Sequence, residues 1–113
     1  HIAALIGAHI IKVKPPTKHI ELSEAKKVYT SENIPIETLT DRIRHIKQSC
    51  FQGKRIVVFS GGAAKDKNGL INEIKELYKG GANGSIIGRN SFQRPLNEAM
   101  DLLNEVTDIY KGR

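Results

Sequence analysis

The sequence predicts an α/β fold in which parallel strands alternate with helices. Three short apolar segments rich in Ile and Val are separated by longer stretches whose apolar residues recur every three or four positions. This alternation implies parallel strands joined by right-handed helical crossovers. The chain has 113 residues, which is enough for one domain with a modest core.

The first part of the chain predicts a helix end, a strand and a second short helix. "HIAALIGA" is typical of the end of a helix, with Gly7 as its C-cap, and a strand over 9–14 follows directly. The alternation of this strand sets Lys12 and Lys14 on the face opposite to its apolar residues. After two prolines, Ser23 is expected to cap a short helix in "SEAKKVY".

The middle of the chain predicts a longer helix and a buried strand. Pro35 suits the first turn of this helix, Gly53 is expected to end it, and Cys50 is expected to be a packed core thiol. The continuous run of β-branched residues over 55–60 is typical of a strand buried on both faces. The apolar residues at helical spacing are Ile36, Leu39, Ile43, Ile46 and Cys50.

The last part repeats the pattern with a helix, a strand and a final helix. Gly80 and Gly81 close the first helix, a very short strand spans 84–88, and Pro95 opens the last helix. The first apolar stripe is Leu70, Ile71, Ile74, Leu77 and Tyr78. The second is Leu96, Ala99, Met100, Leu103, Val106 and Tyr110.

Three strands with their helices match the last part of an eight-stranded (β/α) barrel. The predicted fold class is therefore the C-terminal portion of a (β/α)8 TIM barrel, with residues 1–113 forming a piece of a single domain. We expect this piece to belong to a longer chain, because residue 1 lies inside the first helix and three strands cannot close a barrel.

Composition excludes several functional classes. The longest apolar runs fall short of a membrane span, no secretory leader is visible, and a single cysteine excludes a disulfide framework, so we expect a cytoplasmic protein without a membrane partner. The formal net charge of +6 favours anionic partners. Because the basic residues are dispersed and Trp is absent, small phosphorylated molecules are favoured over nucleic acid.

Glycines follow two of the predicted strands at the points where a phosphate site would form. Ser60, Gly61 and Gly62 end the second strand, and Gly88 and Arg89 end the third. Glycine lets backbone N–H groups approach an anion, and a guanidinium makes a forked contact with phosphate oxygens. In (β/α) barrels the loops after the last two strands commonly bind phosphate. The segment lacks the spacings of a Walker A loop and of a dinucleotide fingerprint.

Lys12 is the candidate nucleophile, because it is predicted to point inward near the C-terminal end of its strand. An amine beside a phosphate site indicates Schiff-base chemistry on a phosphorylated carbonyl compound. A second cation nearby disfavours the protonated amine, and Lys14 would supply it. No metal or other cofactor is expected, since the four histidines lack metal-ligand spacing. Asp66, the carboxylate closest to a strand end, is expected to cap a helix.

These motifs resemble the C-terminal part of the class I fructose-bisphosphate aldolases of the bacterial and archaeal (β/α)-barrel type. The resemblance runs through "GAHIIKVK", "TSEN", "SGGAA" and "GANGSIIGRNSFQRP", in that order. It implies that Lys12 is the Schiff-base lysine and that Ser60–Gly62, Gly88 and Arg89 hold a substrate phosphate. It further implies cleavage of fructose 1,6-bisphosphate to dihydroxyacetone phosphate and glyceraldehyde 3-phosphate by a homo-oligomer in glycolysis or gluconeogenesis.

Two alternatives share these features. One is a related aldolase that acts on another phosphorylated keto sugar or in aromatic-precursor synthesis. The other is a module that binds phosphate or flavin mononucleotide without covalent chemistry, in which Lys12 is only an inward charge. Because the family's acid–base residues lie on earlier strands, this chain by itself is expected to be inactive.

Overall fold

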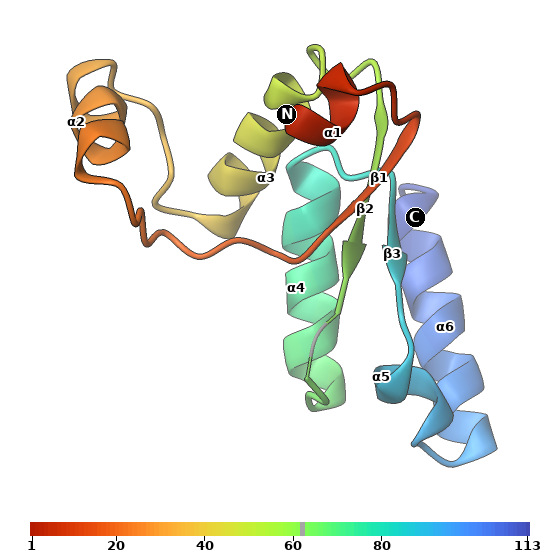
Figure 1. Cartoon of the computed structure of the whole chain (residues 1–113). Coiled ribbons are helices and arrows are strands. Elements are labelled where there is room, and N and C mark those ends of the chain that lie inside the picture. The colour runs from red at the N-terminus through yellow and green to blue at the C-terminus, as the bar shows by residue number, and fades with distance from the viewer. Residues whose placement is uncertain (62) are drawn as a thin grey trace.

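The computed structural model describes residues 1–61 and 63–113, and it contains one parallel sheet in the order β1–β2–β3. The strands are β1 (Ile10–Val13), β2 (Ile56–Ser60) and β3 (Gly84–Ile86). The helices are α1 (Ile2–Leu5), α2 (Ser23–Ser31), α3 (Leu39–Ser49), α4 (Lys67–Lys79), α5 (Arg89–Phe92) and α6 (Leu96–Tyr110). Strands and helices alternate along the chain as predicted (Figure 1), which confirms an open α/β sheet consistent with part of a barrel.

The strand register decides which side chains face the helices. Ile11 pairs with Val57 and Val13 with Phe59, and these residues pack with α3 and α4. The residues between them in each strand therefore point to the opposite face of the sheet. That face is open in this chain, since Ile10, Ile56 and Ile86 are 64%, 46% and 47% exposed.

The open face corrects one prediction about the second strand. The sequence predicted burial on both faces, but only Val57 and Phe59 of β2 are buried, while Val58 is half-buried. The physical reason is that helices cover one side of the sheet and nothing in the described part of the chain covers the other. Cys50 is 1% exposed in the core beside Val57, as predicted.

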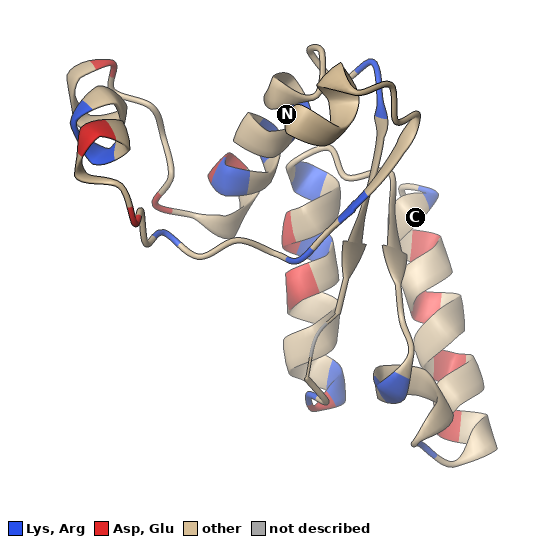
Figure 2. Cartoon of the chain, in the orientation of Figure 1, with Lys and Arg blue, Asp and Glu red and all other residues tan. Residues whose placement is uncertain are grey.

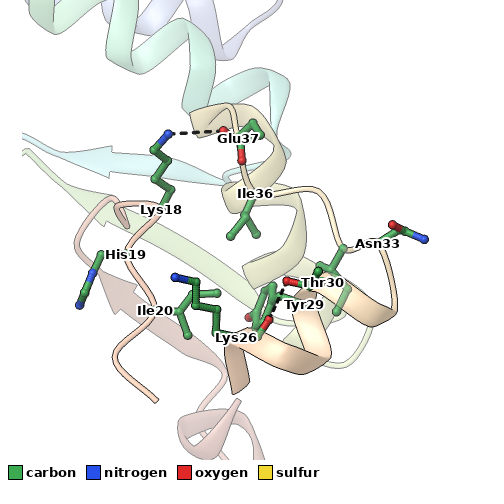
Figure 3. A pocket seen from close by; sticks show the side chains of 10 residues that line it. Lys18, His19, Ile20, Lys26, Tyr29, Thr30, Asn33, Ile36 and Glu37 are labelled. Carbon is green, nitrogen blue, oxygen red and sulfur yellow. Dashed lines mark hydrogen bonds and ion pairs between the residues drawn. The ribbon is translucent and has the colours of Figure 1, made fainter. Parts of the chain in front are cut away.

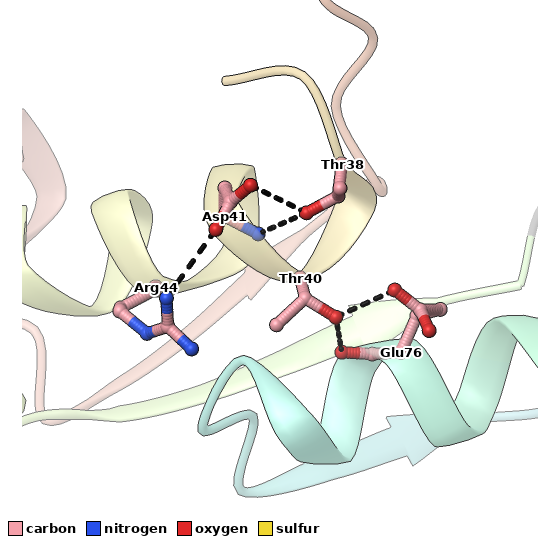
Figure 4. Close-up of polar contacts among 5 residues, drawn as sticks. All are labelled: Thr38, Thr40, Asp41, Arg44 and Glu76. Carbon is pink, nitrogen blue, oxygen red and sulfur yellow. Dashed lines mark hydrogen bonds and ion pairs between the residues drawn. The ribbon is translucent and has the colours of Figure 1, made fainter. Parts of the chain in front are cut away.

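Two helix starts differ from the prediction. The helix α3 begins at Leu39, and its N-cap is Thr38, which accepts a hydrogen bond from the Asp41 N–H at 3.1 Å. Pro35 lies in the preceding irregular segment, because the reciprocal Thr38–Asp41 contacts satisfy the helix end three residues later (Figure 4). Ser23 is the first residue of α2 rather than its cap, and it makes no capping hydrogen bond.

Helix ends follow the predicted glycines in two of three cases. Gly7 and Gly81 follow α1 and α4 with positive φ values of 98° and 94°, and Gly80 is the C-cap of α4. The helix α3 instead ends at Ser49, and the Gly53 N–H returns to the Lys47 carbonyl at 2.8 Å from an added turn.

The last helix buries a different stripe from the predicted one. Ala99 and Val106 are buried as expected, but Leu96 is 79% and Met100 is 52% exposed. Their places in the core are taken by Leu102 and Ile109, which pack against the N-terminal half of α4. The helix is therefore rotated from its predicted face toward α4.

The start of the sheet is fixed by Asn83, which sequence reasoning did not single out. Its side-chain Oδ1 accepts hydrogen bonds from the Val57 N–H at 2.9 Å and from Lys47 Nζ at 2.5 Å. Its own N–H donates to the Val57 carbonyl at 2.9 Å. Burial lowers the pKa of Lys47, and this amine lies at the strand starts, away from the predicted site. Asn83 thus sets the register of β2 against β3.

The helices α3 and α4 approach closely at Gly80. A Cβ atom at this position would lie 2.5 Å from the Ile43 Cβ and 2.9 Å from the Thr40 carbonyl oxygen. A hydrogen bond also links the two helices here, because the Thr40 hydroxyl donates to Glu76 Oε2 at 2.5 Å (Figure 4). The absence of a side chain at Gly80 therefore sets the distance between the two helices.

Gly80→Ala should destabilise the protein by about 1–3 kcal/mol, because the added methyl group overpacks a buried helix contact. Urea unfolding measures this change, with the neighbouring exposed substitution Lys79→Ala as control, expected to change stability by less than about 0.5 kcal/mol. Equal stability of the two variants would contradict the close approach.

Thr40→Val should make the stability of the protein less sensitive to acid. The hydrogen bond from Thr40 lowers the pKa of Glu76, so its stabilisation is present above the ordinary glutamate range of about pH 4.3. It is lost as the pH falls through the lowered pKa. Since the Glu76 side chain is 37% exposed, the effect near pH 7 should stay below about 1 kcal/mol.

The measurement is unfolding free energy from about pH 3 to 7. Thr107→Val is the matched control, because the Thr107 hydroxyl donates to a carbonyl of its own helix at 2.8 Å. A Thr40→Val deficit that stays constant over this range would show that the Glu76 carboxylate is not involved.

Candidate functional site

Lys12 lies on the open face of the sheet. It pairs with Val58, which in turn pairs with Gly84, so these three residues form one row across the strands. The neighbouring residues Ile11 and Val13 pack on the helix side. Lys12 is exposed, with the helices behind it. In a closed barrel this face would be the interior, so the inward direction of Lys12 stays a prediction.

Lys14 follows the last residue of β1 and is also exposed. The next residues, Pro15 and Pro16, lead into the segment that reaches α2 (Figure 1). The Pro16 carbonyl accepts a hydrogen bond from Arg42 Nε at 3.0 Å, which ties this exit segment to α3. The chain therefore leaves the sheet directly after the second lysine, as the prolines indicated.

Ser60 is the last residue of β2, and Gly61 follows it at the C-terminal edge of the sheet. The Gly61 N–H donates to the Ile86 carbonyl at 3.3 Å, so it continues the ladder to β3. A Cβ at Gly61 would lie 3.5 Å from Asn90 Nδ2, which is an ordinary contact. The predicted site residue Gly62 lies outside the described residues.

Gly88 and Arg89 form the turn after β3, two and three residues beyond its end. The Gly88 carbonyl accepts hydrogen bonds from the N–H groups of Ser91 at 2.8 Å and Phe92 at 3.1 Å, which close the short helix α5. Arg89 is exposed. Because the strands are parallel, Ser60 and this turn lie at the same edge of the sheet.

The segments after β2 and β3 are joined by Asn90. This side chain is 3% exposed and is the buried polar residue among those that the structure describes. Its Oδ1 accepts from the Lys65 N–H at 2.7 Å, and its Nδ2 donates to the Ala63 carbonyl at 3.1 Å. Sequence reasoning missed Asn90, although an asparagine directly after "GR" is the kind of residue that hydrogen-bonds backbone groups in loops.

Lys65 and Arg94 complete this junction. Arg94 donates from Nε to the Asn90 carbonyl at 2.7 Å and from a terminal nitrogen to the Lys65 carbonyl at 2.6 Å. The Lys65 ammonium forms an ion pair with Glu73 of α4, whose side chain is 14% exposed. Asp66 caps α4 by accepting from the Gly69 N–H at 3.3 Å, which confirms its predicted role.

Charge is distributed unevenly over these elements. Figure 2 shows basic residues at the starts of α4 and α5, at the edge of the sheet where the strands end. Acidic residues instead follow the length of α6. They are Glu98, Asp101, Glu105 and Asp108. The strand-end edge therefore carries local positive charge, which suits an anionic ligand.

The hollows that the structure shows near α2 lie apart from the strand ends. One of about 730 Å³ is lined by Lys18, His19, Tyr29 and residues near them (Figure 3). Lys18 crosses its rim to pair with Glu37 at 3.5 Å. Its lining does not include Lys12, Ser60 or Arg89. A cavity at the predicted site would need further walls, which a three-stranded open sheet does not provide.

Residues 1–61 and 63–113 hold neither a metal-binding cluster nor a membrane-spanning helix. In this part of the chain no group of three or more His, Cys, Asp or Glu side chains could hold a metal ion. Within the same ranges, no helix is long and apolar enough to cross a membrane.

Comparison with known proteins gives one matching family and several similar proteins. The family model described as DeoC/LacD family aldolase matches residues 1–94. A protein of Chlamydia muridarum named probable fructose-bisphosphate aldolase class 1 is 35% identical over 121 residues, covering 97% of this chain and 34% of the relative. Proteins of the same name from Chlamydia pneumoniae and Chlamydia trachomatis are 36% and 35% identical, with 33% of each covered. The chain thus spans about a third of the length of the curated relatives it matches.

Proposed function

We propose, from the premise that this chain belongs to the DeoC/LacD family of aldolases, that it supplies the nucleophile and a phosphate site of a class I fructose-bisphosphate aldolase. The observation that carries this proposal is the register of the sheet. It sets Lys12 of β1 on the face away from the helices. The neighbouring strand β2 ends at Ser60, at the C-terminal edge of the sheet. The names of the three similar proteins, probable fructose-bisphosphate aldolases class 1, support the choice of substrate.

We further propose that the chain is the C-terminal third of the barrel. Its length relative to the matched proteins supports this, and so does the open face of the sheet, where three isoleucines are exposed. The remaining strands would cover that face and build the walls of the substrate cavity. The homo-oligomeric state, the cytoplasmic location and the place in glycolysis stay predictions.

In the proposed reaction the neutral amine of Lys12 attacks the keto carbon of the open-chain sugar phosphate. A C–N bond forms and water leaves, which gives an iminium ion. A base from the rest of the barrel takes the proton of the C4 hydroxyl as the C3–C4 bond breaks, and the electron pair of that bond moves into the iminium. This leaves an enamine on Lys12 and releases the aldehyde product. Protonation of the enamine and hydrolysis of the new iminium return the amine and release the second product.

The phosphate contacts are proposed from the strand-end edge. The Ser60 hydroxyl and the Arg89 guanidinium come from the ends of neighbouring strands, and Gly88 lets the turn pass close to an anion. The proton-transfer group is proposed to come from the rest of the barrel. Two described carboxylates lie near the loop after β2, and both are engaged: Glu73 in its ion pair with Lys65, and Asp66 as the N-cap of α4.

Lys12→Met should abolish aldol cleavage in the full-length protein and lower turnover by at least about 10³-fold, because no other amine replaces the nucleophile. Dihydroxyacetone phosphate with borohydride should label the wild-type protein at Lys12 and leave this variant unlabelled. Lys111→Met, at an exposed position after α6, is the matched control and should keep normal labelling.

Labelling at another lysine or a zinc requirement would refute the Schiff-base proposal. Normal turnover in Lys12→Met would refute it as well. Retained phosphate binding without any labelling of the wild type would instead favour the module that binds phosphate without covalent chemistry.

Lys14→Met should slow iminium formation at about pH 7 more than at about pH 9, because the lost cation no longer favours the neutral form of the Lys12 amine. Borohydride trapping after a series of reaction times measures the rate of iminium formation at each pH, again with Lys111→Met as control. An equal slowing at both pH values would remove Lys14 from the mechanism and leave Lys12 as the nucleophile.

A further inference from the structure

We infer that Asn90 is a positioning residue that fixes the loop after β2 against the turn after β3. In this role it sets the spacing between the phosphate contacts of Ser60 and of Gly88–Arg89. The inference rests on the proposed function, because the spacing matters only if one phosphate contacts both strand ends. Asn90 itself need not touch the substrate.

The hydrogen bonds of Asn90 reproduce those of a residue in a parallel sheet. Its amide donates to the Ala63 carbonyl at 3.1 Å and accepts from the Lys65 N–H at 2.7 Å, so it brackets the residue between them. A backbone residue in a parallel ladder makes the same pair of contacts on either side of its partner. The side-chain amide therefore stands in for a strand residue where the sheet has ended.

Asn90 takes the place of a strand residue at the point where the backbone hydrogen bonds between β2 and β3 stop. The hydrogen bond from the Gly61 N–H to the Ile86 carbonyl is the last ladder contact between β2 and β3 in the described residues. Beyond this hydrogen bond, the segment after β2 leads to α4 and the segment after β3 leads to α5. Asn90 thus carries the strand pairing forward into the loop that follows Ser60.

Arg94 and Glu73 hold the same junction from its two sides. Arg94 donates to both the Asn90 carbonyl and the Lys65 carbonyl, at 2.7 and 2.6 Å. Glu73 binds the Lys65 ammonium from α4. Lys65 is therefore fixed through its N–H, its carbonyl and its side chain, so residues 63–65 have little freedom to shift relative to the Gly88–Arg89 turn.

The chemistry of the junction requires an amide at position 90. Asp has the same shape and can accept from the Lys65 N–H, but its ionised carboxylate cannot donate to the Ala63 carbonyl. A buried carbonyl that faces a carboxylate oxygen is repelled, so the loop should move away. Asn90→Asp therefore tests positioning with no change in volume, and Asn90→Ala removes both hydrogen bonds.

The experiment uses the full-length protein and two readouts. Calorimetry measures the Kd of inorganic phosphate, and borohydride trapping at Lys12 measures imine formation with dihydroxyacetone, which carries no phosphate. Asn90→Asp and Asn90→Ala should each weaken phosphate binding by about 10-fold or more and leave the trapping rate within about 2-fold of wild type. Asn104→Ala, at an exposed position on α6, should change neither value.

Arg89→Gln separates the two levels of the argument. If it weakens phosphate binding while both folded Asn90 variants bind phosphate as wild type does, the positioning inference is wrong and the proposed phosphate site stands. If Arg89→Gln also binds phosphate normally, the proposed site is wrong and the inference falls with it. An equal loss of phosphate binding and of dihydroxyacetone trapping in Asn90→Asp would indicate general damage to the fold and would overturn the inference.

Discussion

The parallel register of the three strands is the constraint on which the other features of this chain depend. Pairing of Ile11 with Val57 and of Val13 with Phe59 commits one face of the sheet to the helices. Because successive side chains of a strand point to opposite faces, Lys12 must lie on the face away from the helices. A slip of one residue would bury the lysine under α3 and α4 and expose the apolar residues, so the core and the candidate nucleophile are fixed by the same hydrogen-bond ladder.

Side-chain amides secure this register at both ends of the sheet. Where the strands begin, the Asn83 side chain accepts from the Val57 N–H, and the Asn83 backbone N–H donates to the Val57 carbonyl. Asn90 bonds to the backbone of Ala63 and Lys65 where they end. Between these points β3 has only three residues, which is short for a strand that must hold a defined register. The two asparagines add hydrogen bonds between the segments of β2 and β3 beyond both ends of the short strand. The chain can therefore turn sharply at Gly88 directly after β3.

Periodicity in the sequence was sufficient to predict the parallel α/β arrangement, because repeated burial leaves a repeated pattern. It also placed Lys12 on the face away from the helices. It was insufficient for the start of α3 after its N-cap Thr38. The cap depends on a reciprocal contact with Asp41 that competes with the preference of Pro35 for a first turn. It also misjudged Leu96 and Met100, because several apolar residues of α6 could form a stripe and only tertiary packing against α4 selects one.

Asn90 and Arg94 show a different limit. Their partners are backbone groups about 25 to 30 residues earlier in the chain, and backbone groups carry no sequence signal. A polar residue of this kind becomes visible only when the fold brings the two strand ends together. The strand register sets the direction of Lys12, and the amide bridge sets the separation of the two loops. Because contacts within this chain fix both the direction of Lys12 and the separation of the two loops, this part of the proposed site can be rigid before the rest of the barrel covers it. The proposed division of labour follows, with the nucleophile and the phosphate contacts in one contiguous third of the barrel and the proton-transfer group and the cavity walls in the remainder.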